Sequence, residues 1–358
     1  MMLILRWLTV LTLAALAGKM ISRLKLPSIL GWLIIGMFFG PHALGIVSQN
    51  VLDSSWYKVI IIWMQCAFGL MLGTELVWKK MKNYGKGLVV TTLTQSLGTF
   101  LLVTIVFGII FGLIGVPIYL AFVFGSIALA TAPASVVSGF ASGGSLSLYM
   151  IPLMIFLPVI IGIVVGLPAG LLLKKTQGRI QTLAVLIVGI TLTVGIGWFV
   201  NMKLSGITLN YMLMGVSFSA AFTNIVSEER LKEITDQFHP ILAVSLLASI
   251  VDLGAPLNYH LILGAGSYTF IYIAARGMGK YFGARLGAKA MKMPDTVQKY
   301  LGLTLLPHSG VSLVFTGIAC SALAARTELA SILQGTIAAA AVITAKKGFE
   351  LSGEIKTV

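Results

Sequence analysis

Long apolar stretches, each about the length of a membrane-crossing helix, fill most of the chain and are separated by short polar connections. A transmembrane helix needs about 20 predominantly apolar residues to cross a hydrocarbon core of ~30 Å. The pattern therefore predicts an all-α integral membrane protein with about twelve transmembrane helices. The predicted spans are residues 2–21, 28–47, 57–76, 87–113, 117–141, 148–173, 181–201, 207–226, 240–256, 259–282, 299–325 and 329–346.

Charged residues are scarce, which separates this sequence from those of soluble proteins. Hydrophobic residues make up 58% of the chain and charged residues 10%, and the mean hydropathy is +0.99. A globular chain usually carries about 25% charged residues. We expect one transmembrane transporter domain over residues 1–358, with approximate halves 1–175 and 176–358. Cys66 and Cys320 lie singly in apolar stretches, and the sequence has no phosphate loop, zinc pair or Ser-His-Asp set, so we expect no enzyme, cofactor or metal.

The basic residues lie in the connections between spans and not in one patch. The 25 Lys and Arg exceed the 11 Asp and Glu and give a formal charge of +14. A nucleic-acid surface would gather these charges among aromatic residues, so membrane lipid is the expected partner and nucleic acid is not. The positive-inside rule places basic loops in the cytoplasm. With the predicted spans, the basic loops after the first and third spans fall opposite the loop at 174–179, so the segmentation or the rule fails between residues 114 and 180.

The segment SEERLKEITDQFHP, residues 227–240, is the most polar and amphipathic part of the chain. Such a segment is typical of a solvated or interfacial helix. We expect it to join two spans.

Three predicted spans are interrupted by proline and small polar residues, at positions where a lost backbone hydrogen bond is costly. Each interruption alone is also compatible with a plain proline kink. Paired broken helices, however, are typical of a substrate site near the bilayer midplane in secondary transporters. We therefore expect residues 129–135 and 249–256 to meet near the midplane. The interrupting residues are Thr131, Pro133 and Ser135 in the first span, Ser249, Asp252, Gly254 and Pro256 in the second, and Pro307, His308 and Ser309 in the third.

Several segments, in the right order along most of the chain, resemble the monovalent cation/proton antiporter superfamily, including the sodium/hydrogen exchangers. The resemblance implies an inverted-repeat antiporter fold with two crossed, broken helices, transport by alternating access, and a homodimer. The segments are LKLPSILGWLIIGMFFGPHALGIV (24–47), AFGLMLGTELVWKKMKNYGK (67–86), ALATAPASVV (128–137), RGMGKYFGARLGAK (276–289) and GFELSGEI (348–355).

The sequence departs from this family where the family usually carries an acidic pair. The helix after the first broken one should be residues 148–173, which contain no carboxylate; Leu157 and Pro158 stand where the pair is expected. We therefore expect a continuous or mildly kinked apolar helix without an ion-binding side chain. Its proline and glycine residues allow close packing; they include Pro152, Pro158, Gly162 and Gly166.

Only two of the eleven acidic residues touch the predicted spans. Glu75 precedes a basic loop and is expected at the membrane interface, paired with a lysine. Asp252 lies deeper, and an ionisable residue inside a span is a candidate functional residue. Proton and cation can compete for one carboxylate, and oxygen atoms near a helix break suit a hard cation. Alternatively, Asp252 caps a helix or pairs with Arg276 or Lys280.

The candidate ion and proton ligands are thus Asp252, Ser249, Thr131 and Ser135, beside the helix breaks at Pro133, Gly254, Pro256 and Pro307. Arg276 and Lys280 share one helix face and are candidate charge partners. For Lys280 a snorkelling anchor is the favoured interpretation. His308 is a third candidate partner, with a hydrogen-bonded structural histidine as the simpler alternative.

The leading interpretation is a secondary transporter that exchanges a monovalent cation for protons through an atypical ion site, expected in a prokaryotic plasma membrane. A carrier of the sodium/organic-anion symporter or anion-efflux type is an alternative, favoured by the missing acidic pair and the excess of basic residues. A transport-incompetent structural or sensory homologue is a second alternative.

Overall fold

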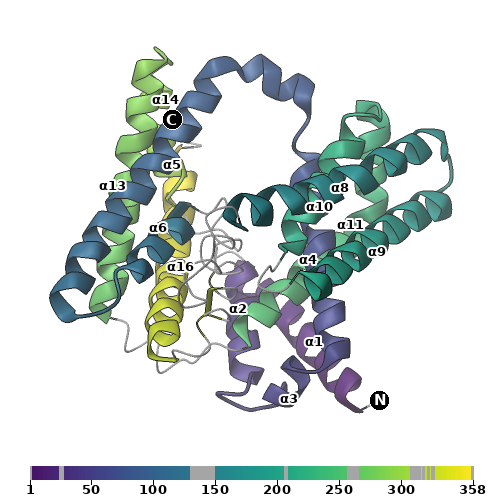
Figure 1. Cartoon of the computed structure of the whole chain (residues 1–358), viewed down its shortest axis with the longest axis horizontal. Helices are drawn as coiled ribbons and strands as arrows, with labels where there is room; N and C mark the ends of the chain where they lie inside the picture. The colour runs from purple at the N-terminus through teal and green to yellow at the C-terminus, as the bar shows by residue number, and fades with distance from the viewer. Residues whose placement is uncertain are drawn as a thin grey trace. The chain divides into compact units, whose positions relative to one another are not determined.

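The computed structural model describes residues 2–23, 28–129, 150–204, 209–255, 266–306, 316, 319–320, 323 and 327–355. Over these residues the chain is helical and contains no strand (Figure 1). The helices are α1 (Met2–Arg23), α2 (Ser28–Phe39), α3 (Gln49–Leu52), α4 (Ser55–Thr74), α5 (Trp78–Ile114), α6 (Tyr119–Leu129), α8 (Met150–Lys175), α9 (Arg179–Lys203), α10 (Tyr211–Thr223), α11 (Glu228–Gly254), α13 (Gly266–Ala290), α14 (Asp295–Thr304) and α16 (Thr327–Ile355).

Six of the described helices are long and apolar enough to cross a membrane. They are α1, the part of α5 after Gly85, α4, α8, α9 and α11. The predicted apolar helix over 148–173 is confirmed from Met150 onward, because α8 runs unbroken to Lys175 with Pro158 and Pro168 inside it. The chain is an integral membrane protein.

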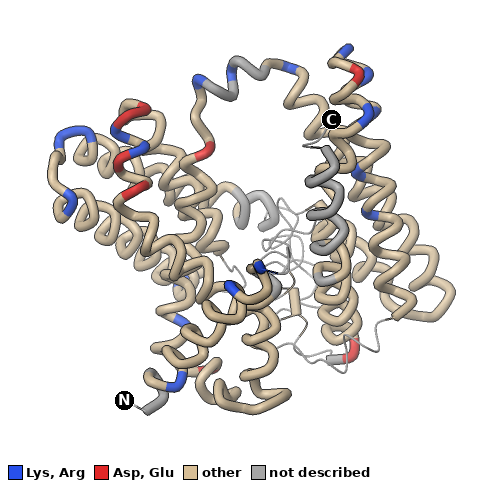
Figure 2. Tube along the Cα trace, turned by 180° about the vertical axis from the view of Figure 1, so that it is seen from behind, with Lys and Arg blue, Asp and Glu red and all other residues tan. Residues whose placement is uncertain are grey.

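The chain forms two compact units, which we describe separately. Unit 1 contains residues 1–47, 84–145 and 253–358, and unit 2 contains residues 48–83 and 146–252. Lysine and arginine are found mainly near helix ends and turns (Figure 2). The break at Gly85, which has φ 64°, lies beside one of the boundaries between the units. A φ of this sign favours glycine.

In unit 2, α8 packs directly on α10 through glycines spaced four residues apart. A Cβ on Gly162, Gly166 or Gly170 would overlap atoms of α10, including the carbonyl oxygen of Phe218 next to Gly166. The absence of side chains at these positions lets the two backbones approach. This confirms that the glycines of the 148–173 helix serve close packing. Leu70, Leu173, Leu186, Phe218 and Phe222 form the buried core around this contact.

In unit 1, α13 packs on α5 through a second glycine series, Gly279, Gly283 and Gly287. Gly279 faces Thr99, while Gly287 faces Thr91, so the two helices are antiparallel. An aromatic cluster fills the space between α5, α6 and α13, with the rings of Phe107 and Phe124 stacked 4.4 Å apart. Tyr272 of α13 lies against both rings.

We predicted that the amphipathic segment 227–240 joins two spans, and this prediction is wrong. It forms the first half of α11, which continues through Pro240 to Gly254. Ile234 and Phe238 are fully buried and belong to the core of unit 2. This packing holds the segment in line with the span, so the proline does not end the helix.

The ends of several unit 2 helices gather on one side. Asn224, after α10, bonds the backbone of Leu76 and Trp78 after α4, while Arg230 of α11 bonds the end of α8. The basic loops after α4 and α8 therefore lie on the same side, in agreement with the positive-inside rule. Of the predicted spans 87–113 and 117–141, the first lies within α5, and α6 covers the second as far as Leu129, where the described residues end.

Candidate functional site

Asp252 lies near the end of α11, beside the first turn of α4. The hydroxyl of Tyr57 donates a hydrogen bond to a carboxylate oxygen of Asp252 over 2.9 Å. Tyr57 is buried and Asp252 is half-buried. A hydroxyl that donates to the carboxylate stabilises its charged form while leaving other oxygen lone pairs for a cation or a proton.

Polar atoms continue along the facing sides of the same two helices. Ser249, one turn before Asp252, is fully buried, and its hydroxyl finds no hydrogen-bond partner in the described part of the chain. One turn further, the hydroxyl of Ser245 lies 3.2 Å from the sulfur of Met64. The pairs 57/252 and 64/245 make α4 and α11 antiparallel, so this polar row runs between them.

Asp252 lies toward the end of α11 that is opposite to Arg230. Asp252 is 22 residues after Arg230, which corresponds to about 33 Å of α-helix. This length is close to the ~30 Å of a hydrocarbon core. Within unit 2, the carboxylate therefore lies at the end opposite to Arg230, beside the start of α4.

The backbone just after Asp252 is held against α2 within unit 1. A Cβ on Gly254 would overlap the carbonyl of Leu33, and one on Gly40 would overlap that of Ala255. Gly40 belongs to the GP motif at the end of the antiporter-like segment 24–47. Its close approach gives a physical reason for glycine there, and brings that motif to the end of α11.

Arg276 and Lys280 lie one turn apart on α13 and are both buried, with exposed fractions of 2% and 7%. A guanidinium nitrogen of Arg276 donates to the carbonyl oxygen of Leu306 over 2.6 Å, just after α14. The sequence favoured a snorkelling anchor for Lys280, but its burial is at odds with that interpretation. The acidic side chains described in unit 1, Asp295 and Glu328, are both exposed.

The remaining candidates divide into those that the structure describes and those that it does not. Glu75 follows α4 directly and is exposed, in agreement with a place at the membrane interface. The candidate metal-ligating residues that the structure describes form no group of three or more. Thr131, Pro133, Ser135, Pro256, Pro307 and His308 lie outside the described residues.

Tyr57 was missed by the sequence analysis. It stands at the start of a span in the run SSWYK, which has no feature that marks a carboxylate partner. Only the register between α4 and α11 brings it to Asp252.

The transmembrane sodium/hydrogen exchanger family model matches residues 8–147. The structure of the sodium proton antiporter MjNhaP1 from Methanocaldococcus jannaschii at pH 8 matches this one with a TM-score of 0.73 and 15% sequence identity. That match covers 98% of this chain and 99% of the other. Residues 8–147 thus resemble the transmembrane part of the sodium/hydrogen exchangers, and the chain as a whole has an antiporter-like fold.

A second structure of the same archaeal antiporter, from an electron-microscopy map, matches with a TM-score of 0.58 and 18% identity, over 97% of this chain and 96% of that chain. No curated protein sequence matches. The predicted fold class, an all-α membrane protein with an antiporter-like fold, is confirmed. The crossing of residues 129–135 with 249–256 involves residues outside the described part and stays a prediction.

The positions on α8 where the resemblance led us to expect an acidic pair make apolar contacts. Leu157 packs against a small core of Ile161, Leu209 and Met214 in unit 2. Pro158 is buried. A carboxylate at position 157 would meet apolar side chains, which disfavour its charge.

Proposed function

We propose that this protein is a secondary transporter that exchanges a monovalent cation for protons by alternating access, in a prokaryotic plasma membrane. The main support is the match to a sodium proton antiporter over nearly the whole length of both chains. The family model adds independent sequence support over residues 8–147.

In this proposal Asp252 is the carboxylate that binds cation and proton in turn. Tyr57 orients it through the 2.9 Å hydrogen bond. The buried hydroxyl of Ser249 supplies a further oxygen one turn away. A carboxylate and a hydroxyl are hard oxygen ligands, which suit a small cation. Binding of the cation and the proton is then mutually exclusive, and this exclusion couples the two fluxes.

The test is Asp252→Asn in proteoliposomes, assayed for proton movement driven by gradients of several monovalent cations. The variant keeps the shape of the side chain and removes its charge. We expect at least a tenfold loss, whereas in the parent protein exchange should fall at acid pH as protons outcompete the cation. Undiminished exchange by Asp252→Asn would reject the carboxylate mechanism.

Asp53 and Glu75 provide matched controls because both are exposed carboxylates. Asp53 precedes α4, near Tyr57, and accepts hydrogen bonds from Gln49 and Lys58. The bond from Gln49 and the charge of Lys58 keep the pKa of Asp53 below its usual value. Asp53→Asn and Glu75→Gln should keep most of the exchange activity.

A carrier of anions with a related fold is the second candidate. Two buried cations, Arg276 and Lys280, lie in unit 1 without a buried carboxylate among its described residues. If Asp252→Asn leaves transport intact and uptake of an organic anion requires Arg276, this second function replaces the first.

A further inference from the structure

Three helix ends of unit 2 meet at Arg230. Its guanidinium donates to the carbonyl oxygen of Leu173 in α8 over 3.2 Å and to the hydroxyl of Thr176 over 3.1 Å. It also donates to the hydroxyl of Thr182 in α9 over 2.6 Å, and it forms an ion pair with Glu233. The bonding capacity of Arg230 is therefore used within the protein, where it fixes the end of α8, the start of α9 and the start of α11.

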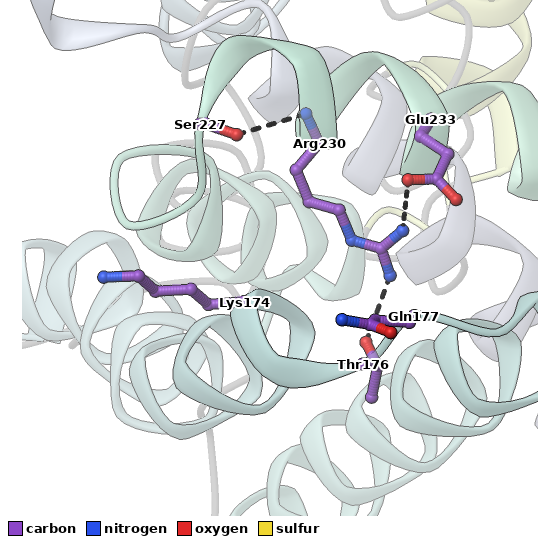
Figure 3. Close-up of a pocket in the computed structure, with 6 residues that line it drawn as sticks. All are labelled: Lys174, Thr176, Gln177, Ser227, Arg230 and Glu233. Carbon is purple, nitrogen blue, oxygen red and sulfur yellow. Dashed lines mark hydrogen bonds and ion pairs between the residues drawn. The ribbon is translucent and has the colours of Figure 1, made fainter.

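A pocket of about 270 Å³ lies over this junction (Figure 3). Glu233 is engaged by Arg230 and by Gln237. In contrast, Lys174 and Gln177 have no hydrogen bond or ion pair to the described residues, and Figure 3 shows the ammonium of Lys174 pointing away from Arg230. These two side chains are the donors available to a ligand. The pocket is lined by Lys174, Thr176, Gln177, Ser227, Arg230 and Glu233.

The charge around the pocket favours an anion. Since Arg230 and Glu233 neutralise each other, Lys174 gives the lining a positive charge. Lys175 and Arg179 add two more charges within the same short loop, although Glu228 and Glu229 begin α11 nearby.

The pocket also lies at the level of lipid headgroups. Lys175 ends one membrane-spanning helix and Arg179 begins the next. Both basic loops of unit 2 lie on this side, which the positive-inside rule assigns to the cytoplasm. The cytoplasmic leaflet carries the anionic lipids, and each nearby Lys or Arg adds about 1 kcal/mol to their attraction.

We propose that this pocket binds the phosphate of an anionic phospholipid headgroup, with Lys174 as its main ligand and Gln177 as a second donor. Zwitterionic lipid also carries phosphate, but its choline cation is repelled by Lys174, Lys175 and Arg179. Because the bound headgroup joins Lys174 at the end of α8 to Gln177 in the loop before α9, it stabilises the junction that Arg230 holds together. This site does not depend on the transported ion.

The experiment measures the thermal unfolding midpoint of the purified full chain in detergent, with increasing dioctanoyl phosphatidylglycerol, dioctanoyl phosphatidylcholine or sodium phosphate. A ligand that binds the folded state raises the midpoint. We expect phosphatidylglycerol to raise it at concentrations where phosphatidylcholine does not. Lys174→Gln should weaken the apparent affinity about fivefold.

Lys175→Gln is the matched control, because it removes the same charge from the neighbouring residue, which does not line the pocket. The apparent affinity of Lys175→Gln for phosphatidylglycerol should fall clearly less than that of Lys174→Gln. Lys174 is exposed, so the unfolding midpoint of both variants without ligand should equal that of the parent. The proposal would be overturned if Lys174→Gln and Lys175→Gln lost the same affinity for phosphatidylglycerol. It would also be overturned if phosphatidylglycerol and phosphatidylcholine raised the unfolding midpoint equally. A rise that sodium phosphate reproduces would assign the pocket to free phosphate and overturn the lipid source.

Discussion

The two units use the same packing device in different chemical settings. In unit 2, Gly162, Gly166 and Gly170 of α8 press on α10 in an apolar environment. In unit 1, the glycines of α13 press on a polar stretch of α5 that contains Thr91, Gln95 and Thr99, all buried.

Close backbone contact serves a different purpose in each unit. The α8 glycines stand on a helix without a carboxylate, so there they serve packing alone. The α13 glycines share their helix with buried Arg276 and Lys280. The close contact with α5 helps to hold the helix that carries them. The glycines of α13 thus lie on a helix with buried cations, whereas α8 carries its charged residues, Lys174 and Lys175, only in its last turn.

Gly166→Ala should have the largest effect on stability. The new Cβ would overlap the carbonyl oxygen of Phe218 and would crowd Ala221. Backbone atoms cannot move aside as a flexible side chain can, so the helices must separate. We expect a loss of about 3 kcal/mol in the free energy of unfolding, measured by SDS titration.

Gly195→Ala on α9 is the control for this substitution, because its Cβ would meet no atom within 4 Å. It should leave stability unchanged or raise it by up to about 1 kcal/mol, since alanine favours the helix. Similar losses in Gly166→Ala and Gly195→Ala would refute a tight α8–α10 seam.

Much of this fold follows from hydropathy alone, whereas its pairings do not. The span at 148–173 was predicted because its apolar run is long and its prolines lie where a membrane helix tolerates them. The join between residues 227–240 and the following span was missed, because burial of Ile234 and Phe238 is a tertiary effect. The presence of Pro240 in the sequence does not reveal that the residues before and after it form one continuous helix.

The candidate site was predictable only in part. Asp252 stood out because acidic residues are rare in the spans, but its partner Tyr57 is 195 residues away. The burial of Lys280 was also missed, since a lysine four residues after another cation fits an interfacial helix equally well. Sequence periodicity identifies a helix face without identifying what covers it.

Arg276→Met is expected to have the second largest effect. The substitution removes the donor to the carbonyl oxygen of Leu306 and leaves this acceptor at the end of α14 without that partner. A hydrogen bond from a charged group contributes about 1.5–3 kcal/mol. The free energy of unfolding should fall by about 2 kcal/mol in the same SDS titration. Arg276→Lys, which keeps the charge with a shorter reach, should recover only part of this loss; full stability of Arg276→Met would contradict the role of the bond.

Gly283→Ala should lower the free energy of unfolding less than Gly166→Ala does. The two variants therefore compare the α5–α13 contact directly with the α8–α10 contact. The Cβ on Gly283 would lie 2.7 Å from both the Cα of Gln95 and the carbonyl oxygen of Thr94, whereas the Cβ on Gly166 would lie closer still to a carbonyl oxygen. We expect a loss of about 1–2 kcal/mol. Gly112→Ala on α5, where a Cβ meets nothing within 4 Å, is the control and should cost nothing. A loss for Gly283→Ala larger than that for Gly166→Ala would reverse the comparison.

Lys280→Met should have the smallest effect, and it tests whether this cation has an acidic partner. Methionine is close to lysine in length and needs no counter-charge. Removing one member of a buried ion pair usually costs about 3–5 kcal/mol, because the other charge is left uncompensated. Removing a buried cation whose charge no carboxylate balances should instead leave stability unchanged or raise it. The acidic side chains described in unit 1 are exposed, so we expect no loss of unfolding free energy for Lys280→Met, with Lys289→Met, exposed near the end of the same helix, as the control. A loss of about 3 kcal/mol confined to Lys280→Met would mean that a carboxylate pairs with Lys280, and the polar seam of unit 1 would then be held by an ion pair as well as by its glycines.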